Sequence, residues 1–192
     1  MTTLPTQFDL LLSVALGIGL AAAVGLRVFL PLLVVSIGGY VGHLHLGESF
    51  AWLGTLPAMI MLSIAAIIEV LAYYVPGVDN LLDTIASPAA LIAGTLVAAA
   101  VMTDLPPMLK WTTAIIAGGG AAGLTQGATA FLRMSSTATT GGLGNAAVST
   151  GELGGSVLLS VLALFVPLLA VALVILFGWM TVRLARRLFR RA

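Results

Sequence analysis

Residues 8–42 form an almost continuous apolar run in which Asp9 and Arg27 are the charged side chains. A membrane-spanning helix needs about 20 apolar residues to cross a ~30 Å hydrocarbon core, so this run is about twice as long as one span requires. Similar runs recur, and of all 192 residues 60% are hydrophobic and 8% are charged. The sequence therefore predicts an all-α, polytopic membrane helix bundle that forms one domain over residues 1–192. We expect about five to six membrane segments.

Prolines and charges predict where these segments begin and end. Arg27 and Pro31 should divide the first run into two pieces, about 10–26 and 28–42. Later spans are expected from Pro57 to Pro76, from Pro88 to about Thr103, from about 111 to Arg133, and over 155–182 with a kink at Pro167.

A weak internal similarity relates the two halves of the chain. Shifting the sequence by 102 residues aligns Gly25 and Phe29 with Gly127 and Phe131, among six matches. Both copies consist of a span, a glycine-rich break and a second span. This predicts a first repeat over 8–87, a linking span over 88–109 and an inverted second repeat over 110–192, with re-entrant breaks.

The stretch "MSSTATTGGLGNAAVSTGELGG" at 134–155 is rich in glycine and hydroxyl side chains and almost free of charge. Irregular backbone is tolerated at membrane depth only where protein buries it or water lines it. Residues 135–150 are therefore predicted to form a re-entrant loop that lines a cavity. Its candidate pathway residues are Ser136, Thr137, Thr139, Thr140 and Asn145. The alternative is an ordinary external loop of about twenty residues.

Glu69 is the single residue that most strongly indicates a functional site. It follows Pro57 by twelve residues, which places it about 18 Å along a helix and inside the hydrocarbon core. A carboxylate there costs ~2.5 kcal/mol or more and marks a functional site by default. Tyr73, one turn later on the same face, could donate a hydrogen bond to it. The alternative is a paired or protonated carboxyl that only ties helices together.

Arg27 and Arg133 are the other charged candidates. Arg27 is flanked by apolar sequence on both sides and is a candidate partner for Glu69. For Arg133 the favoured interpretation is that it snorkels to the outer interface. If Arg27 pairs with Glu69, Arg133 instead offers a positive charge beside the glycine-rich stretch, where an anionic or phosphate-bearing ligand could bind.

Basic residues predict the orientation of the chain. Five of the eight Lys and Arg residues lie in the last ten positions: Arg183, Arg186, Arg187, Arg190 and Arg191. Lys and Arg flank the cytoplasmic ends of spans, so we expect a cytoplasmic C-terminus and an outward-facing 135–154 stretch. A ridge of Gly119, Gly123 and Gly127 permits close helix packing, within the chain or in a homo-oligomer.

Several classes of chemistry are disfavoured. The chain has no cysteine, which excludes disulfides and thiol nucleophiles. His43, His45 and Glu48 lack further ligands nearby, so we expect neither a metal site nor a cofactor. Beyond the C-terminal arginines there is no basic patch for nucleic acid. No nucleophile–base pair is visible, so we do not expect an enzyme.

Three stretches carry a resemblance to a known family. They are "GLRVFLPLL" at 25–33, "EVLAYYVPGVDNLLDTIASP" at 69–88 and "STATTGGLGN" at 136–145. Together they resemble an uncharacterised family of small bacterial integral membrane proteins, known only as a domain of unknown function, DUF4126. The resemblance implies several helices in the bacterial inner membrane and no assigned activity. The expected plan of helices and re-entrant loops is also similar to that of lipid-transporting membrane families, a likeness of architecture alone.

The leading functional hypothesis is a small transporter or permease embedded in the lipid bilayer. Its pathway would be lined by Arg27, Glu69, Tyr73 and the 135–145 stretch. The substrate is unknown, and an anionic or phosphate-bearing solute or lipid is the candidate class. A non-catalytic scaffold or assembly subunit is the alternative, and an intramembrane enzyme comes third.

Overall fold

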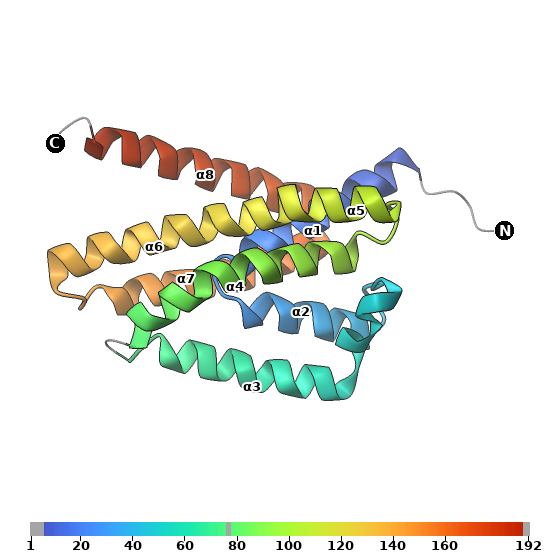
Figure 1. Ribbon diagram of the computed structural model, residues 1–192, viewed down its shortest axis with the longest axis horizontal. Coiled ribbons are helices and arrows are strands. Elements are labelled where there is room, and N and C mark those ends of the chain that lie inside the picture. Colours follow the sequence, from blue (N-terminus) through green and yellow to red (C-terminus); the bar gives the residue numbers. More distant parts are fainter. Residues whose placement is uncertain (1–5, 76–77, 190–192) are drawn as a thin grey trace.

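The computed structural model describes residues 6–75 and 78–189, and every regular element in these ranges is a helix. The elements are α1 (Gln7–Val24), α2 (Phe29–Tyr40), the 3₁₀-helix η1 (Glu48–Gly54), α3 (Leu56–Ala72), α4 (Val78–Val101), α5 (Pro107–Thr113), the π-helix η2 (Ala114–Gly119), α6 (Gly120–Thr140), α7 (Asn145–Phe165) and α8 (Pro167–Phe189). The longer helices run roughly along the long axis of the molecule (Figure 1). The all-α prediction is confirmed.

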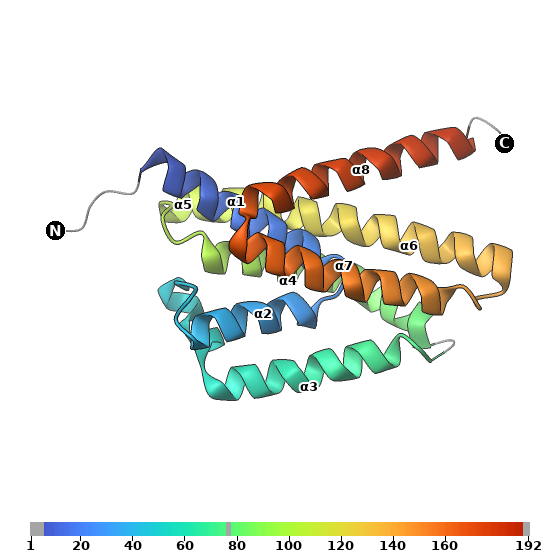
Figure 2. The same ribbon diagram turned by 180° about the vertical axis from the view of Figure 1, so that it is seen from behind.

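The first apolar run is an antiparallel hairpin of α1 and α2. Its turn lies near the middle of the long axis, so both helices reach only about halfway along the molecule (Figures 1 and 2). The expected break is confirmed, although it begins at Gly25, two residues before Arg27. Pro31 lies in the first turn of α2, where its missing N–H removes no helical hydrogen bond.

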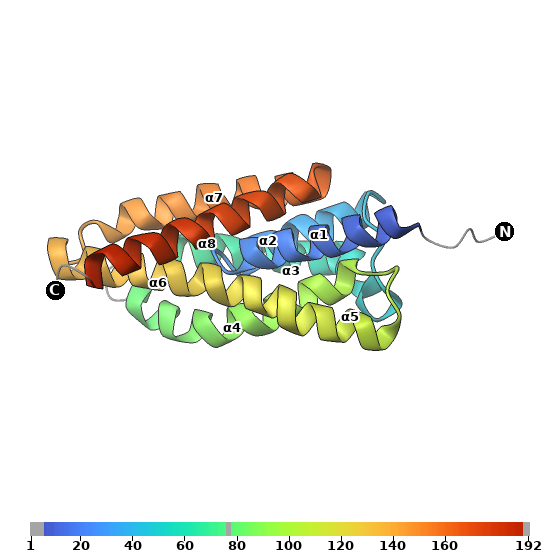
Figure 3. The same ribbon diagram turned by 90° about the horizontal axis from the view of Figure 1, so that it is seen from above.

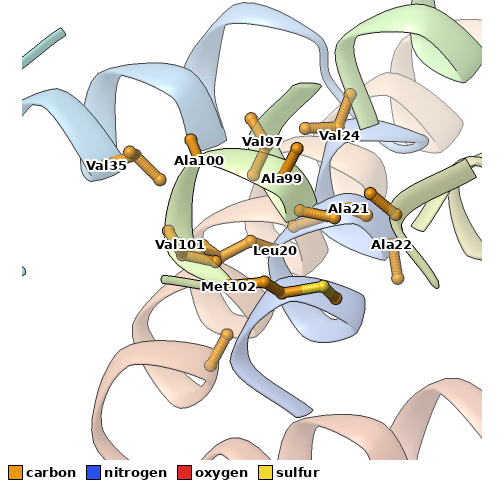
Figure 4. Close-up of a cluster of buried hydrophobic side chains, with 14 of the residues drawn as sticks. Leu20, Ala21, Ala22, Val24, Val35, Val97, Ala99, Ala100, Val101 and Met102 are labelled. Atoms are coloured by element: carbon orange, nitrogen blue, oxygen red, sulfur yellow. The ribbon is translucent and has the colours of Figure 1, made fainter. Parts of the chain in front are cut away.

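The core forms around the C-terminal half of α1. Residues 20–24 are completely buried and pack against residues 97–101 of α4 and the following Met102 (Figure 4). Most of these side chains are alanine or valine, and small side chains let helix backbones approach closely in lipid. α1 is therefore the central helix, and the turn that follows it is held at a fixed position.

The glycine ridge packs within the chain. A Cβ at Gly119 would lie 2.7 Å from Thr95 Oγ1, and one at Gly123 would lie 2.7 Å from Leu91 Cδ2, both on α4. A Cβ at Gly127 would meet nothing within 4 Å. Two of the three glycines thus bring the η2–α6 helix against α4. A homo-oligomer through this ridge stays a prediction.

The predicted boundary at Pro88 is wrong. Pro88 was expected to open a span, but it lies inside α4, which begins ten residues earlier at Val78. The residues before Pro88 and the expected span after it form one helix, because a single missing N–H does not outweigh the helical bonds on either side.

The expected irregular backbone over 135–150 is also wrong. α6 continues to Thr140 and α7 begins at Asn145, which leaves only the turn at 141–144. Gly141 and Gly142 have φ values of +64° and +92°, a conformation that favours glycine and ends α6. The hydroxyls of Ser135, Thr139 and Thr140 donate to carbonyls one turn back in their own helix. This stretch is therefore polar without being irregular.

The third error concerns the last span. α7 and α8 form an antiparallel pair, and the chain reverses at Val166, whose φ and ψ are −141° and 66° (Figure 2). A single kinked span over 155–182 is thus excluded. As a result, the α6–α7 turn and the C-terminal end of α8 lie at the same end of the molecule, not at opposite ends (Figure 3). Arg190 and Arg191 lie outside the described residues.

The surface fits a membrane environment. Three helices are long and apolar enough to cross a bilayer: Gln7–Val24, Leu81–Val101 and Asn145–Phe165. The bent pair η1–α3 adds a fourth if it counts as one span. Exposed apolar side chains cover α3: Ile60, Met61, Ile64, Ile67, Ile68 and Leu71. The structure thus supports a membrane protein, while the five to six segments and the inverted repeat stay predictions.

Candidate functional site

Arg27 lies in the α1–α2 turn and is 1% exposed. Its Nη2 donates to the Ser149 carbonyl at 3.0 Å and lies 3.3 Å from Glu152 Oε2, both on α7. Its guanidinium carbon is 3.8 Å from the centre of the Tyr73 ring. The Nε and Nη1 atoms have no hydrogen-bond partner. Arg27 therefore forms its ion pair with Glu152. The sequence had suggested Glu69 as its partner, and that prediction is wrong.

Glu69 on α3 has a different role. Its Oε1 accepts a hydrogen bond from the Val28 N–H at 2.7 Å, and its Oε2 accepts one from the Phe29 N–H at 3.0 Å. These N–H groups belong to the first turn of α2, where Val28 provides no side-chain cap. The negative charge also complements the positive end of the α2 dipole. Glu69 thus caps α2 from a neighbouring helix.

Arg133 on α6 is 3% exposed, so the expectation that it snorkels to the interface is wrong. Its Nε donates to Glu152 Oε1 at 3.0 Å, and its Nη2 pairs with Glu152 Oε2. Asp83 on α4 lies 3.6 Å from the same Nε. The Glu152 carboxylate therefore forms ion pairs with both buried guanidinium groups, those of Arg27 and Arg133.

The Tyr73 ring packs against both arginines of the site. Both guanidinium groups pack on its ring, since the Arg133 guanidinium carbon lies 4.3 Å from the ring centre. Such cation–π contacts are strongest away from water. Tyr73 interacts with the Asp83 carboxyl. The expected hydrogen bond from Tyr73 to Glu69 is not formed, and both Glu69 oxygens accept backbone N–H groups instead.

Asn145 connects the α6–α7 turn to α4. Its Nδ2 donates to Asp79 Oδ2 at 2.9 Å and to Thr137 Oγ1 at 3.1 Å. Asn145 and Asp79 are both buried. The other hydroxyls of the predicted pathway do not reach this cluster. The Ser136 hydroxyl lies 3.5 Å from Thr140 Oγ1, which also accepts a hydrogen bond from the Gly144 N–H. The Thr139 hydroxyl donates to the Ser135 carbonyl in its own helix.

The charges in this cluster do not balance. We define the charge cluster as Arg27, Arg133, Glu69, Asp79, Asp83 and Glu152, which places two guanidinium groups among four carboxyl groups. Three guanidinium nitrogens, Arg27 Nε and Nη1 and Arg133 Nη1, have no hydrogen-bond partner. Buried charges are normally paired and hydrogen-bonded. Such a cluster is suited to taking up protons, and it can accept an anion only by exchange.

A cavity of about 530 Å³ adjoins the cluster between α6, α7 and α8. Its polar lining side chains are Thr125, Thr129 and Glu152, and the rest of its wall is apolar or glycine. Its size is typical of small-molecule sites, at about 300–1,000 Å³. Because Glu152 belongs both to the cavity wall and to the charge cluster, it joins the two.

The comparison with known protein families agrees with this architecture. A family model described as a domain of unknown function, DUF4126, matches residues 14–187. The chain belongs to this family. The match includes every residue of the charge cluster and of the cavity wall. No curated protein and no solved structure matches the chain.

Sequence reasoning missed part of the site in this DUF4126 chain. Asp79, Asp83, Ser149 and Glu152 are not among the predicted site residues. One signal pointed to Glu152, since it is the sole acidic residue after Asp104. In the part of the chain that the structure describes, no group of three or more His, Asp or Glu side chains is placed to hold a metal ion.

Proposed function

We propose that this DUF4126 chain is a small membrane transporter or permease whose pathway passes the charge cluster. One observation carries the proposal: three buried guanidinium nitrogens without partners lie in a cluster that adjoins a cavity. Each unsatisfied buried donor costs about 1–3 kcal/mol. A cluster that only fastened helices would gain from satisfying these donors, whereas a ligand site leaves them for a ligand that comes and goes.

A non-catalytic scaffold is the second candidate, and a specific observation favours it. Glu69 holds the N-terminus of α2, and Asn145 joins α7 to Asp79 on α4. These contacts fasten helices together and need no ligand. The two candidates differ in one measurable respect, because a transporter must give water access to the cluster from at least one face of the membrane.

Cysteine labelling tests this access without knowledge of the substrate. The natural chain has no cysteine, so each introduced thiol is unique. Ser149 and Ser160 are both fully buried on α7, and they lie about 16 Å apart. Ser149 touches the cluster through the Arg27 bond, whereas Ser160 is remote from it in sequence and serves as the matched control.

A membrane-impermeant thiol reagent is applied to right-side-out and inverted vesicles. We expect the Ser149→Cys variant to react from at least one face, and the Ser160→Cys variant to remain unreactive from both. No reaction of Ser149→Cys from either face would favour the scaffold. Equal reaction of both variants would also overturn the proposal, because access would then reflect loose packing and not a pathway.

A further inference from the structure

The shape of the cavity indicates what it holds. Its wall extends from Val148 to Leu159 on α7, a length of about 16 Å along the helix axis. The described α8 residues in the wall are all apolar: Leu173, Val174, Leu176, Phe177 and Met180. A long, largely apolar space parallel to the helices offers few partners to a polar solute. It is complementary to a single hydrocarbon chain lying along the helices.

The polar part of the cavity indicates the head group. Among the described residues that line the cavity, Glu152 is the sole charged one, and its carboxylate occupies the position at which both guanidinium groups converge. Guanidinium groups bind phosphate, sulfonate and carboxylate oxygens through paired N–H donors. An anionic head group in place of the Glu152 carboxylate would meet Arg27 and Arg133 together.

We propose that the cavity binds an anionic amphiphile with one hydrocarbon chain, whose head group replaces Glu152 at the two arginines while Glu152 takes up one proton. This inference rests on the proposed transport function and names its substrate class. The O–H bond formed on Glu152 offsets the charge of the incoming anion. The net charge of the cluster is then the same with and without the ligand.

The surroundings of Glu152 explain why this carboxyl is the one that exchanges. Arg27 faces it from the α1–α2 turn, Glu69 and Tyr73 from α3, Asp83 from α4 and Arg133 from α6. Glu69 is held by two backbone N–H groups, and Asp83 is held by Tyr73 and Arg133. From α8 the cavity wall presents apolar side chains alone. A ligand in the cavity therefore meets Glu152 before any other charged group.

Binding of decanesulfonate to the full chain, purified in a neutral maltoside detergent, tests the cavity. Gly151 lines the cavity and a Cβ there would meet nothing within 4 Å, so the backbone can carry a phenylalanine whose ring reduces the space at the cavity wall. Gly154 is equally open but does not line the cavity, and Gly154→Phe is the matched control. We expect wild type and Gly154→Phe to bind decanesulfonate, and Gly151→Phe to bind it at least about tenfold more weakly.

Two other probes test the anionic head group and the hydrocarbon chain of the ligand separately. Decyltrimethylammonium has the same chain with a cationic head, and inorganic sulfate has an anionic head without a chain. Both should bind at least about tenfold more weakly than decanesulfonate, because each offers only one half of the recognised chemistry. Equal binding of either probe, or equal decanesulfonate binding by the two phenylalanine variants, would overturn the proposal.

The uptake of a proton is tested by measuring decanesulfonate binding at several pH values, because the sulfonate itself stays charged throughout. With one proton taken up per ligand, the wild-type dissociation constant should rise about tenfold per pH unit where Glu152 is ionised, and Glu152→Gln should remove this dependence. If Glu152→Gln does not fold, calorimetry of the wild type in buffers of different ionisation enthalpy gives the proton count. An uptake of zero protons would overturn the exchange.

The outcomes also separate this inference from the transport proposal. If decanesulfonate does not bind while Ser149→Cys reacts with the impermeant reagent, the substrate class is wrong and the transport proposal stands. If decanesulfonate binds while Ser149→Cys never reacts, the cavity is a static amphiphile site and the transport proposal fails.

Discussion

Replacing Glu69 with glutamine should lower the free energy of unfolding by about 2–4 kcal/mol. Both carboxylate oxygens accept backbone N–H groups, from Val28 and Phe29. A glutamine side chain has one acceptor oxygen and would turn its NH₂ donors toward the other N–H. One charge-assisted hydrogen bond is worth about 1.5–3 kcal/mol. The lost charge at the N-terminus of α2 adds about 0.3–1 kcal/mol.

Thermal unfolding of the helical signal in neutral detergent measures this loss. For a chain of this size each kcal/mol shifts the midpoint by about 2–4 °C, so Glu69→Gln should unfold about 4–16 °C below wild type. Glu48 is an exposed glutamate on η1, and Glu48→Gln is the matched control, with an expected change within about 0.5 kcal/mol. A midpoint for Glu69→Gln within about 2 °C of wild type would refute the capping role.

Two further predictions concern the hairpins. A Cβ at Gly25 would lie 1.8 Å from Thr125 Oγ1 and 2.2 Å from the Ala122 carbonyl oxygen, so Gly25→Ala should cost about 3 kcal/mol or more in the same unfolding assay. Gly127→Ala, which meets nothing within 4 Å, is its control and should be neutral or slightly stabilising. Leu143 belongs to the α6–α7 turn and Arg186 to the last turn of α8, and both are exposed. These two segments lie at the same end of the molecule (Figure 3). The Leu143→Cys and Arg186→Cys variants should therefore react with an impermeant thiol reagent from the same face of the membrane, and reaction from opposite faces would contradict the chain reversal at Val166.

The fold could be predicted from the sequence where one physical effect dominates. The apolar runs predicted the helices, and the break beside Arg27 followed from a charge and a proline in an apolar run. Pro167 was misread because proline interrupts the helical bonds in the same way at a kink and at a reversal. Only the packing of α8 against α1 and α7 decides between them, and this packing has no local signal.

The 135–150 stretch was misread for a different reason. Serine, threonine and glycine favour turns when their polar groups have no other partner. Here the hydroxyls of Thr139 and Thr140 donate within α6, and the packing of Asn145 against Asp79 holds the start of α7. Tertiary contacts thus outweighed the local preference.

The site could be predicted only in part. Arg27, Glu69 and Tyr73 were found because polar groups within apolar runs are costly and conspicuous. Glu152 was missed because its neighbours are glycine and serine, which hide a buried helix position in a polar background. The pairing of Arg27 with Glu152, 125 residues apart, depends on the turn between α1 and α2. No local sequence pattern could therefore have predicted that pairing.

Coupled flux is the most direct test of the account. Wild-type protein, Gly151→Phe and Gly154→Phe are reconstituted into liposomes that contain a pH-sensitive dye, with protein-free liposomes as the baseline. An inward gradient of decanesulfonate should acidify the lumen with wild type and Gly154→Phe, because each anion enters with one proton, and Gly151→Phe should abolish this signal. Acidification no faster than in protein-free liposomes, or equally fast with Gly151→Phe, would contradict transport of an anionic amphiphile through this cluster.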